Sequence, residues 1–377
     1  MAGGPALLAW PGPMAAASSR RRPLAASRAA PLPAGRPVAP RTRDRRRELV
    51  ACLRSWLAAV GRPTLEELLR VAPSDALPLN EALVAFGQQL WLEEAPYWRY
   101  AESVNAVAQL QPLSRGTLGF AWSLAYTWIS EEPGQHHIAL PSVCLAALVA
   151  LALFWGWPRI AALVGAGFAG MMRPSDFLLS RRRFLVLPRD ALGTTSYTLF
   201  QIMSPKTRAT AGRHQVARVD PPDIVELLDG VFGCMPPSAR LWPHSQSTFR
   251  ARFVELLRAL GLPWDRSARY AGFDPGEVVD LGSLRSGGAT ALWCETEDAE
   301  FTRQRGRWLN VRVMQIYLQE TMAVGLLSRL PAATRARVQL WASHAPRIQQ
   351  QAVAWLREGV PPDEWYDRWH SVPALGP

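Results

Sequence analysis

The sequence predicts an α+β fold, in which an all-α helical bundle precedes a mainly helical domain that carries a small three-stranded antiparallel sheet. Helical hydrophobic periodicity covers most of the chain and is interrupted between residues 182 and 220 by short segments rich in β-branched and aromatic residues. The length of 377 residues exceeds what one hydrophobic core usually supports, so we expect two domains. Hydrophobic residues make up 49% of the chain, which excludes a wholly disordered protein.

Residues 1–48 are rich in Ala, Pro, Ser and Arg and have no hydrophobic period, which predicts a disordered basic arm. The first 47 residues hold ten arginines and one acidic residue, Asp44. The rest has 32 basic against 30 acidic residues, so the formal charge of +11 is a weak argument for a nucleic-acid partner. A solvated tail, an organelle transit peptide, a nuclear address and a non-specific DNA-binding arm all remain open for this segment.

Residues 49–135 are expected to form a helical bundle domain. Leu53, Trp56, Leu57 and Val60 fall at i, i+3, i+4 and i+7, which places them on one face of a helix. Similar stripes recur further along this segment. Several short helices can therefore bury their apolar faces against one another.

The segment 139–172 is almost uncharged, and a hydropathy window would flag it as a membrane span. Trp157-Pro158-Arg159 interrupts the segment after about seventeen apolar residues, and glycine-rich sequence follows. Two buried core helices account for this pattern better than one membrane helix. We therefore expect no membrane partner.

Three short strands, separated by Pro and Gly turns, are expected after this apolar segment. Their ranges are 184–187, 195–202 and 214–219. Helical patterns then continue to the C-terminus, with Gly261-Leu262-Pro263 as a helix stop signal. We expect a second domain over residues 136–325 and a C-terminal helical extension over residues 326–377.

The cysteines and histidines give no sign of a metal site. Cys52, Cys144, Cys234 and Cys294 lie far apart, which argues against a disulfide framework or a zinc knuckle and favours a reducing, intracellular compartment. The six histidines lack the spacing of metal ligands. We therefore assign no metal.

Lys206 is the only lysine in the chain, beside 41 arginines. A lysine amine can release a proton at accessible pH, whereas an arginine holds its proton, so Lys206 is a candidate general acid. It lies in Ser204-Pro205-Lys206-Thr207-Arg208, a turn between two of the expected strands.

Two further segments are of interest. Leu284-Arg285-Ser286-Gly287-Gly288-Ala289-Thr290 places an arginine before small residues that begin a helix. Small residues let a backbone approach closely and a helix N-terminus favours anions, so this is a modest signal for an anion site. Gly306-Arg307-Trp308 opens a helical segment, residues 309–320, in which Tyr317 follows Trp308 by nine residues. A tyrosine there would by itself usually be a packing residue.

The order of these residues resembles the tyrosine recombinase (phage integrase-type) family. Gly170-Met171-Met172-Arg173-Pro174-Ser175-Asp176 resembles the first-arginine box of that family, and a lysine, a second arginine, a tryptophan and a tyrosine follow in family order. The matching positions are Arg173, Lys206, Arg285, Trp308 and Tyr317. The resemblance covers roughly residues 140–325, and its most specific part runs from Arg285 to Tyr317.

The resemblance implies a site-specific DNA recombinase or integrase that forms a 3′-phosphotyrosyl DNA intermediate by transesterification, without a metal or a nucleotide cofactor. Tyr317 would attack the phosphorus, while Arg173 and Arg285 would fork onto its non-bridging oxygens. Lys206 would protonate the departing 5′-oxygen, and Trp308 would donate its indole N–H to a phosphate oxygen. Double-stranded DNA as partner, a homo-oligomer that is tetrameric on DNA, and a location in the nucleus or nucleoid follow from the same resemblance.

One position departs from the family pattern. Gly282 stands three residues before Arg285, where the family usually has histidine, so a proton acceptor is missing. Asp280 or His214 could replace it, or the two arginines could lower the tyrosine pKa enough alone. The alternative is a catalytically impaired recombinase-fold protein that binds DNA. In the family a C-terminal helix often docks on a neighbouring protomer, so the extension is either an oligomer contact or a helix packed on its own domain.

Overall fold

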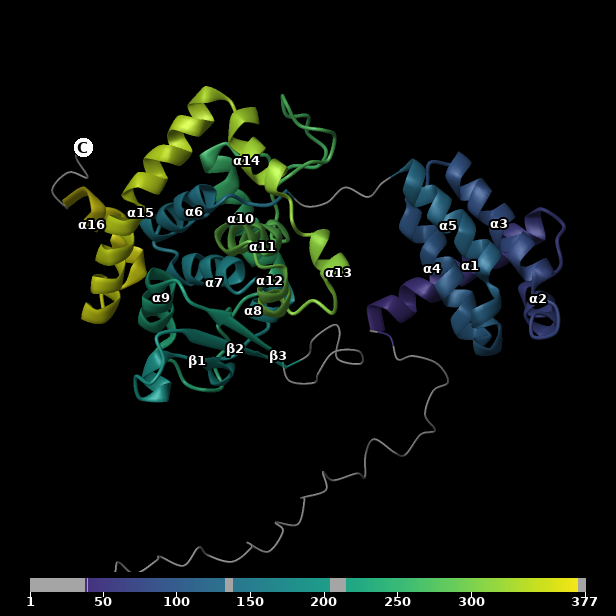
Figure 1. The fold of residues 1–377 in the computed structure, drawn as a ribbon, viewed down its shortest axis with the longest axis horizontal. Coiled ribbons are helices and arrows are strands. Elements are labelled where there is room, and N and C mark those ends of the chain that lie inside the picture. Colours follow the sequence, from purple (N-terminus) through teal and green to yellow (C-terminus); the bar gives the residue numbers. More distant parts are fainter. Residues whose placement is uncertain (1–37, 39, 133–137, 204–214, 372–377) are drawn as a thin grey trace, which may run out of the picture. The chain divides into compact units, whose positions relative to one another are not determined.

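The computed structural model describes residues 38, 40–132, 138–203 and 215–371 (Figure 1). Most of the expected basic arm, up to position 37, lies outside these residues. The chain divides into two compact units, residues 1–134 and 135–377. Helices dominate both units, and the second contains a three-stranded antiparallel sheet. The predicted α+β fold class is confirmed.

Helices α1 to α5 surround one apolar core in the first unit. Their bounds are α1 Pro40–Ala59, α2 Leu65–Val71, α3 Leu77–Leu92, α4 Tyr97–Leu110 and α5 Gly119–Glu131. Leu53 and Leu57 of the expected stripe are buried in this core, together with Tyr100 and Trp128, whose rings stack 5.9 Å apart. Val60 is exposed because α1 has already ended before it.

The helical part of the chain begins earlier than predicted. Because α1 starts at Pro40, the expectation that the arm extends to residue 48 is wrong at its C-terminal end. Arg46 gives the physical reason: its guanidinium donates to the side chains of Glu102 and Gln109 on α4, each at 2.9 Å. These contacts hold the basic first turns of α1 against the neighbouring helix.

Helices α6 (Ser142–Phe154) and α7 (Pro158–Ala169) are the two buried core helices expected from the apolar segment. The chain turns before Pro158, which opens α7 because proline is tolerated in the first turn of a helix. Most side chains of both helices lie in the core of the second unit. Within the described ranges, no helix combines the length and apolar character needed to cross a membrane.

The sheet has the order β1-β2-β3, and both pairings are antiparallel. Its strands are β1 (Leu185–Val186), β2 (Thr198–Ile202) and β3 (Gln215–Val219). Phe200 pairs with Leu185 on one side and Ala217 on the other, and all three are buried, so this face of the sheet covers the core. The predicted sheet is confirmed, with shorter strands than expected.

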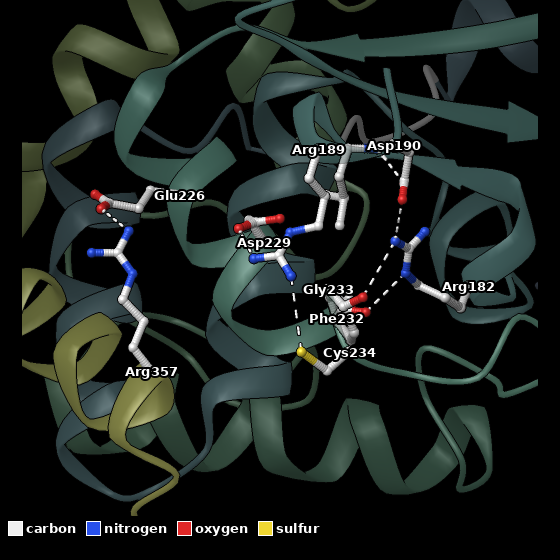
Figure 2. Close-up of polar contacts among 10 residues, drawn as sticks. Arg182, Arg189, Asp190, Glu226, Asp229, Phe232, Gly233, Cys234 and Arg357 are labelled. Carbon is white, nitrogen blue, oxygen red and sulfur yellow. Dashed lines mark hydrogen bonds and ion pairs between the residues drawn. The ribbon is translucent and has the colours of Figure 1, made fainter. Parts of the chain in front are cut away.

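A buried arginine ties the sheet to α9 (Pro222–Phe232). Arg182, just before β1, donates to the carbonyl oxygen of Phe232 at 2.9 Å and to the carboxylate of Asp190 at 2.8 Å (Figure 2). It also donates to the carbonyl oxygen of Leu185 at 2.8 Å. Beside it, Arg189 pairs with Asp229 of α9. These contacts anchor the two-residue strand β1, whose ladder offers few hydrogen bonds of its own.

The later helices return to the same core. Their bounds are α8 Pro174–Leu178, α10 Gln246–Leu260, α11 Ser283–Thr296, α12 Ala299–Gly306, α13 Val311–Gln315, α14 Glu320–Arg329, α15 Ala332–Glu358 and α16 Trp365–Ser371. Helix α15 packs on α6 and α9, and its Ile348 and Trp355 are buried. The C-terminal extension therefore packs on its own domain, and its expected start at residue 326 falls inside α14.

Candidate active site

Helix α11 positions Arg285 in its first turn, close to α7. A side chain at Gly288 would collide with the carbonyl oxygen of Phe168 on α7, so this close approach requires glycine. The small residues after Arg285 thus serve helix packing.

Arg285 is held by backbone carbonyls on both sides. Its Nη1 donates to Met171 O at 2.5 Å and its Nη2 to Gly306 O at 2.7 Å. Its Nε is buried and has no hydrogen-bond partner in the described part of the chain. Because a guanidinium carries five N–H donors, these two bonds leave three N–H groups without an acceptor among the described residues.

Trp308 and Tyr317 lie against this guanidinium. The central carbon of Arg285 is 4.5 Å from the centre of the Trp308 ring and 5.3 Å from that of Tyr317, and the two rings are 5.1 Å apart. Trp308 is buried, and among the described residues its Nε1 has no hydrogen-bond partner. A tyrosine ring, an indole ring and a guanidinium thus lie together.

Tyr317 is not on a continuous helix, contrary to the prediction for residues 309–320. Helix α13 ends at Gln315, and Tyr317 lies in the turn that follows, where its amide donates to Met314 O at 2.7 Å. The Thr290 hydroxyl of α11 donates to the Tyr317 carbonyl at 3.3 Å. The backbone that carries the candidate nucleophile is therefore tied to the helix that carries Arg285.

Arg173 stands at the start of α8, where its amide donates to the Asp176 carboxylate at 3.1 Å. In the part of the chain that the structure describes, the Arg173 guanidinium has no hydrogen bond or ion pair. The Asp176 carboxylate also pairs with Arg307, which places Arg173 beside the same cluster, and the charge of Arg173 lowers the pKa values of Arg285 and Arg307. The structure thus brings together four of the five predicted site residues.

Arg307 belongs to the cluster although it was not among the predicted site residues. It donates to Gly170 O and Met171 O at 3.1 Å each, and it forms an ion pair with Asp176 at 3.6 Å. The sequence did place both residues beside matched positions, because Arg307 directly precedes Trp308 and Asp176 lies in the first-arginine box. Neither position, however, is one of the matching positions in the family resemblance.

The cluster holds more positive than negative charge. Burial, followed by the charges of Arg307 and Arg173, lowers the pKa of Arg285 to about 9. Burial likewise lowers the pKa of Arg307 to about 10, against the opposing effect of the Asp176 carboxylate. Because burial and mutual repulsion disfavour these guanidinium charges, a bound anion would relieve both costs.

Lys206 and His214 lie outside the described residues. Gly282 is the residue before α11, and its amide donates to the Asp280 carboxylate at 2.7 Å. The same carboxylate accepts from Arg266 at 3.5 Å. Asp280 is thus engaged at the start of α11, and the described residues show no contact that identifies a base for Tyr317.

No family model and no curated protein matches the chain. Among solved structures, the chain is similar to the crystal structure of XerA recombinase, with 14% sequence identity and a TM-score of 0.35. The likeness covers 75% of this chain and 98% of that one. A score this low leaves the function to be inferred from the side chains described above.

Proposed function

We propose that this protein is a DNA strand transferase of the tyrosine recombinase type, with Tyr317 as its nucleophile. One observation carries the proposal: the Tyr317 ring lies against the buried Arg285 guanidinium, within a cluster whose excess positive charge favours the binding of an anion. The Trp308 ring lies against the same guanidinium, and its buried indole N–H has no partner among the described residues. A phosphodiester has the charge and the acceptor oxygens that such a cluster would bind.

In the proposed reaction, the Tyr317 oxygen forms a bond to phosphorus while the bond from phosphorus to the 5′-oxygen breaks. The hydroxyl proton of Tyr317 leaves to a base or to solvent, and Lys206 gives a proton to the departing 5′-oxygen. Arg173 and Arg285 stabilise the charge that develops on the non-bridging oxygens. The products are a 3′-phosphotyrosyl link and a free 5′-hydroxyl.

Double-stranded DNA is the proposed partner. A tetramer on DNA and a nuclear or nucleoid location belong to the same proposal. The buried cluster of the second unit supports the catalytic part of this proposal. The target sequence depends on which side chains reach the base edges.

The experiment is to incubate the purified chain with labelled, nicked duplexes that carry a randomised central segment. Cleavage near the nick releases a short fragment and traps the covalent intermediate, which is then seen as labelled protein on a denaturing gel. Peptide mapping should place the DNA on Tyr317, and Tyr317→Phe should abolish the adduct. Tyr366→Phe is the matched control, because Tyr366 is exposed on α16 and should leave the adduct unchanged.

The second candidate function is a DNA-binding protein that keeps the fold without cleaving DNA. Gly282 favours it, because the histidine expected there is missing and Asp280 is engaged at the start of α11. Under this alternative, wild type and Tyr317→Phe bind the same duplexes with equal affinity and neither forms an adduct. An adduct that persists in Tyr317→Phe would contradict the choice of nucleophile.

A further inference from the structure

The backbone of Arg307 adopts a conformation that is costly for an arginine. Its φ is 59°, in the left-handed region where side chains with a Cβ lose about 1 kcal/mol relative to glycine. Met171, whose carbonyl oxygen accepts from Arg307, is also left-handed, with a φ of 46°. Strain of this kind persists only where the surroundings hold it in place.

The side chain of Arg307 provides contacts that can offset this strain. Its guanidinium joins Gly170 O, Met171 O and the Asp176 carboxylate, and the Arg307 and Asp176 side chains are only 7% and 4% exposed. Asp176 in turn accepts from the Arg173 amide. Arg307 therefore fixes the loop that carries Arg173.

Arg307 and Arg285 also form a closed ring of contacts. The Met171 carbonyl oxygen accepts from both, at 2.5 Å from Arg285 and 3.1 Å from Arg307. The second carbonyl bound by Arg285 belongs to Gly306, the residue just before Arg307. A shift of Arg307 would consequently move both acceptors of Arg285, and it would also move Trp308, the next residue in the chain.

We propose that Arg307 is a positioning residue for strand transfer: it holds Arg173, Arg285 and Trp308 around a single phosphate. This inference rests on the proposed function. Because its side chain is buried and engaged with the protein, Arg307 acts through its neighbours and contributes little to DNA affinity. Its loss should slow the chemical step, since a displacement of about 1 Å in a catalytic group can cost on the order of a hundredfold in rate.

The test compares Arg307→Gly, Arg307→Lys and the control Arg312→Ala. Glycine adopts the left-handed backbone without steric cost, so Arg307→Gly removes the side chain and not the local conformation. Lysine keeps the charge, but its compact ammonium group lacks the planar fork with which Arg307 reaches two carbonyls and a carboxylate. Arg312 is exposed on neighbouring α13.

Three quantities are measured for each protein: the dissociation constant for the nicked duplex, the single-turnover rate of adduct formation, and the melting temperature with and without inorganic phosphate. We expect Arg307→Gly to lower the adduct rate by about a hundredfold with an unchanged dissociation constant. Arg307→Lys should recover part of the rate, and Arg312→Ala should match wild type. Phosphate should raise the melting temperature of wild type and Arg312→Ala, but not of Arg307→Gly.

Other results would overturn either the positioning role of Arg307 or the proposed function. If Arg307→Gly binds the duplex more weakly but forms the adduct at an unchanged rate, Arg307 contacts DNA. If its adduct rate is unchanged and only its melting temperature falls, Arg307 is purely structural. Either overturns the positioning role. If wild type forms no adduct, the proposed function fails, and the phosphate shift alone then decides the positioning role. A wild-type protein that also gains no stability from phosphate overturns both.

Discussion

The Arg285 guanidinium lies over the Trp308 ring, with its central carbon 4.5 Å from the ring centre, and both side chains are buried. The Tyr317 ring borders the same guanidinium. Two aromatic rings and two carbonyl acceptors thus fix the orientation of the cation before any ligand binds. A site ordered in advance does not lose side-chain freedom when it binds an anion, which favours stabilisation of a transition state.

We expect Arg285→Lys to be poorly tolerated, although it keeps the charge. An ammonium group lacks the planar fork that reaches both Met171 O and Gly306 O, and each charged hydrogen bond contributes about 1.5–3 kcal/mol. The free energy of unfolding, measured in urea, should fall by about 2 kcal/mol, and adduct formation should be lost. Arg312→Lys, at an exposed position, is the control and should change neither. Normal stability of Arg285→Lys would mean that the carbonyl contacts do not hold the guanidinium.

The close packing of α11 on α7 gives a second prediction. Gly288→Ala places a Cβ against the Phe168 carbonyl, which is backbone and cannot move aside, so we expect a loss of stability of about 2 kcal/mol or more. Gly325→Ala is the matched control, because Gly325 lies in α14 with open space around it. Alanine favours the helix at that position and should raise the free energy of unfolding by about 0.5–1 kcal/mol. Equal melting temperatures of the two variants would contradict the packing.

Much of this fold could be predicted because local patterns agree with tertiary packing. The apolar segment broken at Pro158 became two buried helices, and the strand-rich stretch became the three-stranded sheet. The boundary between the basic arm and α1 could not be predicted, because no local pattern shows that Arg46 contacts α4. Likewise, the helical pattern after Trp308 does not show that the chain leaves the helix before Tyr317.

The candidate site was only partly predictable from the sequence. Resemblance to a family supplied Arg173, Arg285, Trp308 and Tyr317, but spacing cannot reveal which carbonyls an arginine binds. Arg307 was missed for this reason, since its importance depends on Gly170 and Met171, more than 130 residues away. Long-range contacts between segments far apart in the chain are what the structure adds.

The Arg182–Asp190 pair predicts how stability depends on pH. The hydrogen bond from Arg182 lowers the pKa of Asp190. The pair therefore stabilises the folded state at pH 7, and this stabilisation is lost as the pH falls through the lowered pKa. Asp190→Asn should therefore be less stable than wild type at pH 7, by about 1 kcal/mol because the carboxylate is partly exposed. Below about pH 4 the difference should shrink. Asp363→Asn, at an exposed position, should show no such dependence.

Cys144 predicts a change in stability at alkaline pH. Burial raises the pKa of its thiol to about 12, whereas an unfolded cysteine ionises near pH 8.5, so between these values the unfolded state releases a proton that the folded state keeps. Stability should therefore fall with rising pH, by up to about 1.4 kcal/mol per pH unit above pH 8.5. Other buried groups also titrate in this range, so the quantity to measure is the difference between wild type and Cys144→Ala. We expect that difference to decrease from pH 8 to pH 10, while the difference between wild type and Cys52→Ala, at an exposed thiol, stays constant. A constant difference for Cys144→Ala would show that this thiol ionises equally in both states.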